Sequence, residues 1–178
     1  MTNSREVREW VRSIAVAVVL ALVIRFFLFE VFVVEGRSMY PTLEEHERLV
    51  VNKFIYRFEE PQPGDIVVFE HEPRRDFIKR VLGVGGDSIE IRDGVVYRNR
   101  TAVNEPYLLD RMDYQLAYGP VEVPPGYLFL LGDFRRNSMD SRDPRVGFVS
   151  VERIKGRAFL IFWPLSEIRV LSDKVAEQ

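Results

Sequence analysis

Apolar residues form one long run near the N-terminus and several short runs in the rest of the chain. Residues 11–34 are mostly apolar, and the charged residues among them are Arg12, Arg25 and Glu30. A helix that spans a membrane needs roughly 20 mainly apolar residues. The run reaches that length if the Arg25 guanidinium extends to the far interface. We therefore predict a single transmembrane anchor over residues 13–30.

Positive charges before this run predict its orientation. Arg5, Arg8 and Arg12 precede the apolar residues, and such charges favour a cytoplasmic N-terminus. The prediction is a single-pass protein of the cell membrane. It has a cytoplasmic N-terminus over residues 1–12, then the anchor, then an extracytoplasmic domain over residues 31–178.

Two other interpretations of the run remain open. It could be a buried helix in a soluble core, or a cleaved signal peptide whose cleavage site is Ala15-Val16-Ala17. A cleavage site at that position would follow almost no apolar segment, and the apolar residues continue well beyond it. The sequence therefore favours an uncleaved anchor.

Beyond the anchor, short β-branched runs alternate with Gly, Pro and Asp, which is typical of strands. No segment there has a 3.6-residue apolar period over three turns. The fold class we predict is therefore mostly β, with one antiparallel domain after a single helix. Strands are predicted in RLVVNKF, IVVFE, FIKRVLGV, YLFLLGD and GRAFLIFW, at residues 48–54, 66–70, 77–84, 127–133 and 156–163.

A hairpin is predicted in SIEIRDGVVYRN. Ile89 and Ile91 alternate with polar residues, and Asp93-Gly94 favours the type I′ turn that joins two antiparallel strands. Residues 99–120 show no clear period, and we expect a long loop or an inserted segment there.

Composition excludes several classes of chemistry. The 178 residues carry a formal net charge of −2 and no basic block, so a nucleic-acid partner is not expected. The chain has no cysteine, which excludes disulfides, thiolate catalysis and cysteine-ligated metals. Its two histidines, His46 and His71, lie in charged segments without metal-binding spacing, and we expect both to be structural surface residues.

Ser38 is a candidate nucleophile. It lies in EGRSMYPTL, directly after an apolar run, and Gly36 allows close approach of the backbone or a positive φ. A serine hydroxyl needs a neighbouring base to become nucleophilic. Taken alone, the serine is a weak signal, because most serines have structural roles.

Lys79 is the candidate base. It lies inside the apolar strand FIKRVLGV, where burial would disfavour the ammonium and lower its pKa from about 10.4. Alternation along the strand places Lys79 on the face of Phe77 and Val81, and Arg80 on the other face. A neutral lysine could take the proton of a serine hydroxyl, as in Ser–Lys hydrolases. An outward-facing lysine remains the alternative from the pattern alone.

A third polar cluster, GDFRRNSMDSRD, follows a strongly apolar strand at residues 132–143. It is either a plain surface turn or a hydrogen-bonded loop that supports a site. In the second case Asp140 pairs with Arg142 and Ser138 orients a neighbour. Polar loops on a rigid β scaffold are common places for functional sites.

Together and in this order, these segments resemble the type I signal peptidases, serine proteases that remove signal peptides from exported proteins. The resemblance covers essentially the whole chain. It rests on the N-terminal run followed by GRSMYPTL, RLVVNKF, FIKRVLGVGGD and LGDFRRNSMDSRD. It implies the antiparallel β-rich catalytic domain that these enzymes share with self-cleaving repressors.

The resemblance implies catalytic roles for two residues and no cofactor or metal. Ser38 matches the acylating serine, and Lys79 matches its general base. Gly36 stands where some members carry a second oxyanion-hole serine. The oxyanion would therefore depend on backbone N–H groups, including that of Ser38.

The resemblance also implies residues that support the catalytic lysine and residues that line the substrate pockets. Ser138 matches a serine that hydrogen-bonds the catalytic lysine, and Asp140 and Arg142 match a supporting ion pair. The residues that match the small pockets for alanine-sized side chains are Val34, Met39, Leu43 and Ile78.

The implied substrates are exported preproteins cut after a small-X-small site such as Ala-X-Ala. The implied partners are signal peptides and the lipid bilayer, with the protein translocase as a further candidate. Two alternatives stay open: a specialised peptidase for pilus or conjugation precursors, and a non-catalytic membrane-tethered binding module. A self-cleaving repressor would need an N-terminal DNA-binding module, where this chain has the apolar run.

Three residues depart from the pattern of these peptidases. Phe134 stands where Asn is usual, Arg136 replaces Asp or Asn, and Gly85 replaces a common Pro. None is a proposed reacting group. They bear on the shape of the 132–143 loop and of the turn after Lys79.

Overall fold

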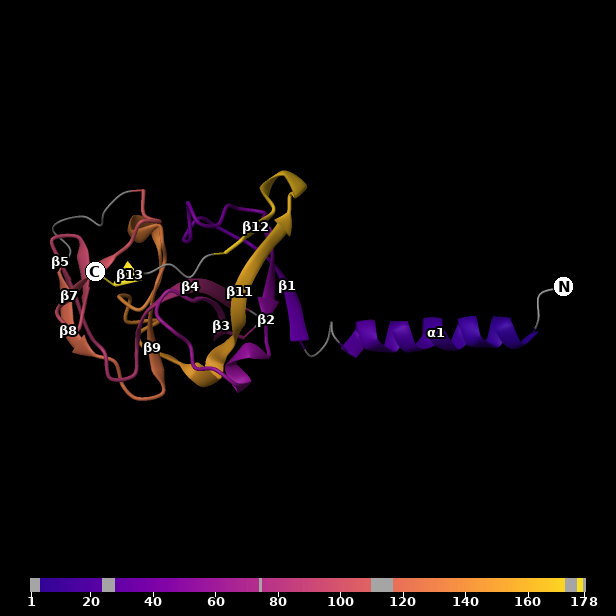
Figure 1. The fold of residues 1–178 in the computed structure, drawn as a ribbon. Coiled ribbons are helices and arrows are strands. Elements are labelled where there is room, and N and C mark those ends of the chain that lie inside the picture. The colour runs from indigo at the N-terminus through magenta and orange to yellow at the C-terminus, as the bar shows by residue number, and fades with distance from the viewer. Residues whose placement is uncertain (1–3, 24–27, 74, 110–116, 172–175, 178) are drawn as a thin grey trace.

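The computed structural model describes residues 4–23, 28–73, 75–109, 117–171 and 176–177. One helix, α1 (Ser4–Val23), precedes a body made of two antiparallel sheets. In Figure 1 the helix extends away from this body. The mostly antiparallel β fold predicted from the sequence is confirmed.

The structure departs from the predicted anchor at its C-terminal end. The sequence predicts an anchor over residues 13–30, but α1 ends at Val23 and strand β1 (Phe29–Val33) begins inside that range. β1 pairs with β2 (Arg48–Asn52) along its whole length, so its backbone groups bond across strands rather than within a helix. Among the described residues, no helix is both long and apolar enough to cross a membrane.

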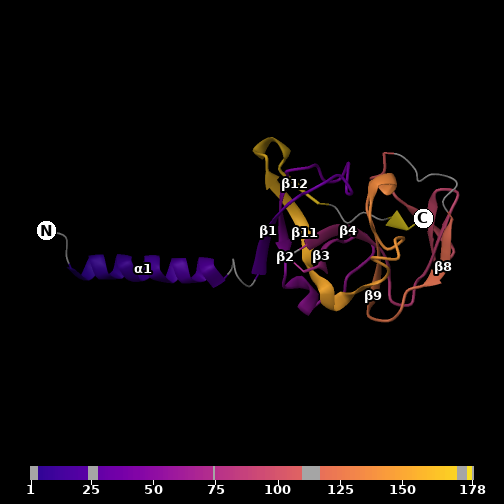
Figure 2. The ribbon, with the colours of Figure 1, turned by 180° about the vertical axis from the view of Figure 1, so that it is seen from behind.

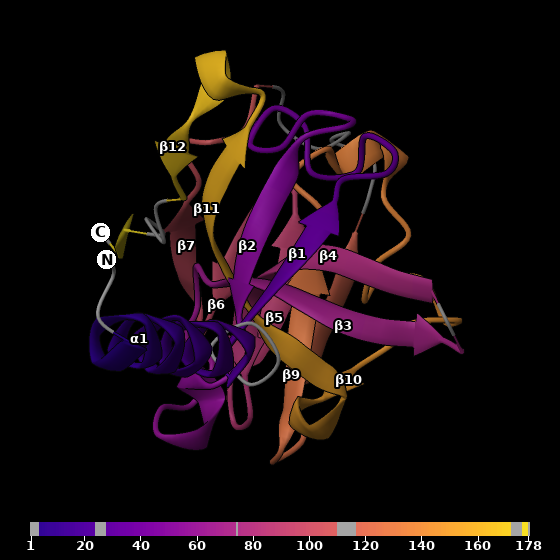
Figure 3. The same cartoon turned by 90° about the vertical axis from the view of Figure 1, so that its right-hand side faces the viewer.

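The larger sheet has the strand order β1-β2-β11-β3-β4-β9-β10, and β12 pairs with β11. Figure 3 shows β1, β2 and β11 side by side. Its remaining strands are β3 (Ile66–Glu72), β4 (Arg75–Val84), β9 (Tyr127–Leu131), β10 (Val149–Ser150), β11 (Ile154–Trp163) and β12 (Arg169–Val170). Short 3-10 helices lie at Ile55–Arg57, Arg135–Asn137, Val151–Arg153 and Leu165–Glu167.

The smaller sheet lies on the side of the body away from α1, as Figures 1 and 2 show. Its order is β13-β7-β6-β5-β8. Its strands are β5 (Ser88–Arg92), β6 (Val95–Arg98), β7 (Thr101–Asn104), β8 (Tyr118–Glu122) and β13 (Ala176–Glu177). The predicted hairpin is confirmed, because Asp93 and Gly94 join β5 to β6 with φ values of 51° and 73°.

The predicted loop over residues 99–120 is wrong in part. β7 and the start of β8 fall inside it, and residues 110–116 lie outside the described part of the chain. β7 is only four residues long and half exposed, so its side chains show no apolar alternation. It is held by pairing with β6, which sequence periodicity does not report.

The burial of β3 explains why central strands appear in the sequence as continuous apolar runs. Ile66 and Val68 pack into one core cluster, whereas Val67 and Phe69 pack into another. The strand is therefore buried on both faces. β4 lies next to β3, and this rigid, buried strand carries Lys79.

Candidate active site

Ser38 lies in a turn segment that follows β1. Gly36, two residues earlier, has φ +80°, a conformation that side-chain-bearing residues rarely adopt. The Ser38 carbonyl accepts a hydrogen bond of 3.0 Å from the backbone N–H of Phe134. This bond joins the turn to the 132–143 loop at the serine itself.

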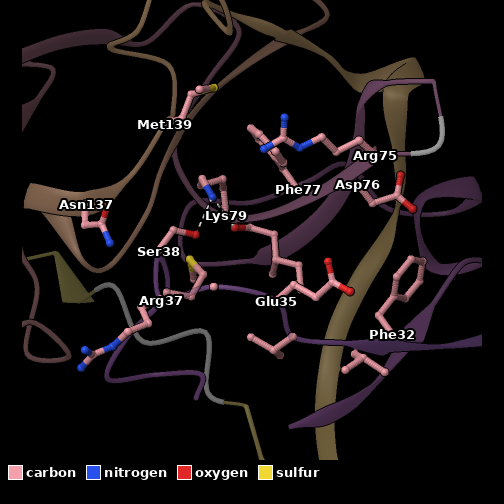
Figure 4. A pocket seen from close by; sticks show the side chains of 15 residues that line it. Phe32, Glu35, Arg37, Ser38, Arg75, Asp76, Phe77, Lys79, Asn137 and Met139 are labelled. Carbon is pink, nitrogen blue, oxygen red and sulfur yellow. Dashed lines mark hydrogen bonds between the residues drawn. The ribbon is translucent and has the colours of Figure 1, made fainter. Parts of the chain in front are cut away.

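Lys79 and Ser38 meet although 41 residues separate them in the chain. Lys79 Nζ lies 2.8 Å from Ser38 Oγ, and Figure 4 shows the two side chains pointing toward each other. The amine also donates to the Ile78 carbonyl at 2.9 Å. The Phe77 ring centroid lies 5.0 Å from the same nitrogen. The lysine is therefore enclosed and points at the serine hydroxyl.

Burial changes the acidity of this lysine. Lys79 is 3% exposed, and desolvation lowers the pKa of its ammonium to about 8, despite the opposing effect of the Asp140 and Asp133 carboxylates. A substantial fraction of the amine is neutral at mildly alkaline pH. A neutral amine beside a hydroxyl can accept its proton.

The 132–143 loop is held by a buried carboxylate. Asp140 is fully buried. Its Oδ2 accepts a 3.1 Å hydrogen bond from the Gly132 N–H, and the Arg142 Nε donates to Oδ1 at 2.7 Å. Arg142 also donates to the Arg135 carbonyl at 2.9 Å. Asp140 and Arg142 thus form an ion pair that fixes the loop backbone.

Ser138 does not make the bond to Lys79 that the resemblance implies. Its Oγ is buried and has no hydrogen-bond partner in the described part of the chain. The side chain lies against Gly132, where a Cβ on the glycine would collide with it. Packing on that glycine, rather than a bond to the amine, fixes its position in this structure.

Sequence reasoning missed a second buried ion pair directly behind the site. Arg80 is 1% exposed, and its Nη2 lies 2.7 Å from Asp133 Oδ2. The Thr42 hydroxyl donates to the same carboxylate oxygen at 2.5 Å. Three segments that surround Ser38 are joined in this way. The available signal was an arginine inside an apolar strand, which needs a buried partner.

An open cleft of about 390 Å³ leads to Ser38 and Lys79, as Figure 4 shows. Three of the four predicted pocket residues, Val34, Met39 and Ile78, line it. Leu43 is fully buried in a core cluster behind Met39 and is absent from the lining. The cleft is otherwise lined by residues 32–33, 35–38, 75–77, 79, 137 and 139.

His71 differs from the surface residue expected. Its ring stacks on Phe77 with centroids 4.4 Å apart, and its side chain is only 7% exposed. Phe77 lines the cleft, so His71 supports the cleft wall from behind. His46 is exposed in a turn, as predicted.

The residues that depart from the peptidase pattern occupy different environments. Phe134 contributes its backbone N–H to the Ser38 carbonyl, and Arg136 is exposed. A Cβ on Gly85 would lie 2.9 Å from the Pro125 Cα, so only glycine fits the turn after β4 without a backbone shift.

The fold and the site together define a class of enzyme. A serine hydroxyl lies beside a buried amine at an open cleft in a β scaffold, and this geometry is compatible with nucleophilic hydrolysis. The profile of the family described as "Signal peptidase, peptidase S26" matches residues 7–163. The chain belongs to this family, as a bacterial type I signal peptidase, and is a serine endopeptidase.

Two relatives from Bacillus subtilis agree with the family. Signal peptidase I T of Bacillus subtilis (strain 168) is 42% identical over 170 residues, covering 90% of this chain and 88% of its own. Signal peptidase I S of the same strain is 39% identical over 178 residues, covering 95% and 96%. A crystal structure of a signal peptidase I from Enterococcus faecalis V583 is 31% identical, with a TM-score of 0.48 over 56% of this chain and 97% of that one.

Gly132→Ala tests how tightly the loop must sit against the serine turn. A Cβ at this position would lie 2.5 Å from the Ser38 carbonyl oxygen, so the backbone of one segment must shift. We expect a loss of about 1–3 kcal/mol in the free energy of unfolding, typical of overpacking, together with a fall in kcat for peptide cleavage.

Gly126→Ala is the matched control, because Gly126 has φ +79° and open space around its Cα. It should lose stability through backbone strain alone and keep its kcat. Denaturant unfolding and steady-state kinetics measure both. Unchanged kcat in Gly132→Ala would contradict the importance of this contact.

Proposed function

We propose that this chain removes N-terminal signal peptides from exported preproteins by cutting after an Ala-X-Ala-like site. Ser38 is the nucleophile and Lys79 the general base. The observation that carries the proposal is the 2.8 Å distance between Lys79 Nζ and Ser38 Oγ, with the lysine buried. No other lysine or histidine in the described residues is hydrogen-bonded to Ser38.

The proposed mechanism proceeds through an acyl-enzyme. Neutral Lys79 accepts the Ser38 proton while Oγ attacks the scissile carbonyl carbon. Backbone N–H groups, among them that of Ser38, stabilise the oxyanion. The lysine ammonium then protonates the leaving amine. A water molecule then gives a proton to Lys79 as its oxygen attacks the ester carbonyl carbon. The bond from that carbon to Ser38 Oγ breaks, and the Lys79 ammonium returns the proton to Oγ.

The cleft supports selection of small side chains. Val34, Met39 and Ile78 present apolar walls next to Ser38, and Leu43 packs behind Met39. The segment that continues β1, the edge strand of the larger sheet, also lines the cleft. We propose that residues before the cut add as an extended strand along this segment, with large side chains excluded by collision.

Substrate-side substitutions test this selection. We expect replacement of the Ala immediately before the cut by Leu to lower kcat/KM at least about 100-fold, because the pocket has to reject added volume. The same replacement at the middle position of Ala-X-Ala should change the rate little. Cleavage of purified preproteins, followed by mass spectrometry of the mature N-terminus, measures both. Equal rates for Ala and Leu before the cut would sink the proposed specificity.

The lowered pKa of Lys79 predicts the pH dependence. The base works only when deprotonated, so kcat/KM should rise with pH and reach half its maximum near pH 8, the pKa of Lys79. A lysine with an ordinary pKa would place the midpoint near 10.4. Initial rates between pH 6 and 10 with one preprotein decide between them. A rate that is flat or falls between pH 7 and 9 would contradict the role of Lys79.

We further propose that the apolar segment of residues 13–30, which begins in α1 and continues past Val23, holds the enzyme at a membrane, with the N-terminus on the cytoplasmic side and the β body outside. The described side chains of α1 are exposed, which leaves its apolar residues without a protein partner in the described structure. Arg8 and Arg12 suit the cytoplasmic end. Such a location would place the site near signal peptides and the translocase. The large apolar residues concerned are Val7, Trp10, Val11, Ile14, Val16, Val18, Val19, Leu20 and Leu22.

Membrane fractionation tests this location. The full chain should sediment with membranes and resist extraction at alkaline pH, and external protease should digest the β body in spheroplasts. A chain that begins at residue 28 should be released from the membrane. Recovery of the full chain in the soluble fraction would contradict the proposal.

A further inference from the structure

A second hollow lies beside the 132–143 loop, in addition to the cleft. Its volume is about 170 Å³, and its lining residues are Tyr40, Leu109, Asp133, Phe134, Arg135 and Arg136. The Phe134 N–H donates to the Ser38 carbonyl, so one wall of the hollow is bonded to the backbone of the serine. The rings of Phe134 and Tyr40 pack edge to face with centroids 6.2 Å apart. The hollow therefore has a fixed aromatic wall.

The hollow and the cleft are lined by adjacent stretches of the chain. The two share no lining residue, but chain neighbours line both: Arg136 borders the hollow, and Asn137 the cleft. Arg37 belongs to the cleft, and its guanidinium lies 5.0 Å from the ring centroid of Tyr40, which belongs to the hollow. Arg37 and Asn137 are therefore the cleft residues next to the hollow, and we refer to these two residues as the ridge.

The ridge lies at one end of the cleft. An extended chain bound over Ser38 has residues on both sides of the scissile bond. In Figure 4 the cleft extends from Ser38 toward Phe32 and Asp76, while Arg37 and Asn137 lie at the opposite end. Under the proposed function the residues before the cut fill the cleft. The residues after the cut then leave over the ridge into the hollow.

The charges around the hollow are of two kinds. Asp133 is neutralised by Arg80, and Arg135 by Glu105 through two hydrogen bonds, so neither is available to a ligand. Arg136 and Arg37 are exposed, and neither forms an ion pair within the described part of the chain. The available charge at the rim is therefore positive. Opposite charge on a bound segment is favoured there.

We propose that this hollow binds the first residues of the mature protein, the segment after the cut, and that Arg136 and Arg37 favour an acidic side chain in that segment. The inference rests on the proposed function, because it takes the direction of the substrate from it. The proposed function selects small residues before the cut, and this inference adds a preference for acidic residues after the cut.

Three preproteins that are identical up to the cut test the inference. Residues two to four after the cut are all Glu, all Gln or all Lys, and kcat/KM is measured at low ionic strength. We expect the order Glu, Gln, Lys, with Glu above Lys by roughly fivefold, the size expected for exposed ion pairs. The ratio should shrink in 1 M salt, where the Debye length is about 3 Å.

Arg136→Glu should reverse the order, with the Lys preprotein cut faster than the Glu preprotein. Arg100→Glu is the matched control, because it makes the same charge change in the exposed turn between β6 and β7. It should keep the wild-type ratio.

The outcomes separate the two claims. Equal kcat/KM for the three preproteins, or a ratio that Arg136→Glu leaves unchanged, overturns the inference while cleavage of the Gln preprotein upholds the proposed function. If the wild-type enzyme cuts none of the three, the proposed function and the inference fail together.

Discussion

Replacing Lys79 by methionine is expected to lower kcat for preprotein cleavage by roughly 10²–10⁴-fold, the contribution typical of a general base. Methionine fills similar space without an amine that can take the Ser38 proton. Lys79 Nζ is the nitrogen at 2.8 Å from the Ser38 hydroxyl. Steady-state kinetics at pH 9, above the lysine pKa of about 8, measure the full effect.

Thermal unfolding separates this loss from misfolding. The folded-state pKa of Lys79 is lowered to about 8, so the buried amine reduces stability below that pH, and this cost disappears as pH rises past the unfolded pKa of about 10.4. Lys79→Met should therefore melt at no lower temperature than the wild type at pH 7. Lys53→Met, in a half-exposed pair with Glu30, is the control and should keep its kcat. A Lys79→Met enzyme that cuts within tenfold of the wild type would exclude the lysine as base.

Asp133→Ala is expected to lower the free energy of unfolding by about 3–5 kcal/mol, the cost of leaving a buried charge without its partner. The side chains of Arg80 and Asp133 are 1% and 0% exposed. The variant would leave the Arg80 guanidinium enclosed and would also remove the acceptor of the Thr42 hydroxyl. Urea denaturation gives the change directly.

The surface pair Arg92–Glu90 provides the matched control, because its side chains are 55% and 31% exposed. Glu90→Ala should cost no more than about 1 kcal/mol. The double variant Arg80→Met, Asp133→Leu should lose less than the sum of the two single losses, since both charges are removed together. A loss below 1 kcal/mol in Asp133→Ala would show that the pair does not join the segments around Ser38.

The sequence predicts well those strands whose burial or adjoining turn restricts which residues can occupy them. The run at Ile66–Phe69 is buried on both faces, and the turn at Asp93-Gly94 requires residues that accept positive φ. β7 and the start of β8 have no such restriction on their residues, because hydrogen bonds to a neighbouring strand hold them in place. The sequence pattern does not separate β1 from the predicted anchor, since an exposed apolar edge strand and an apolar helix look alike in a single sequence.

The sequence indicates which residues form the candidate site, but it does not indicate the distances between them. Local pattern makes Ser38 and Lys79 weak candidates and the resemblance of their motifs strengthens both, but nothing in the residues reports a contact across 41 positions. The same limit hid the Arg80–Asp133 pair and the stacking of His71 on Phe77. Conversely, the expected bond of Ser138 is missing here, since a shared motif fixes the residue and not its rotamer.

The central claim is that Ser38 and Lys79 together cut preproteins after a small-X-small site. Its most direct test is mass spectrometry of the products when one purified Ala-X-Ala preprotein meets the detergent-solubilised wild type, Ser38→Ala and Lys79→Ala. The wild type should yield a mature chain that begins directly after the second Ala, and the two folded variants should yield none. A wild type that leaves the preprotein intact, or a variant that produces the same mature chain at the wild-type rate, would contradict the claim.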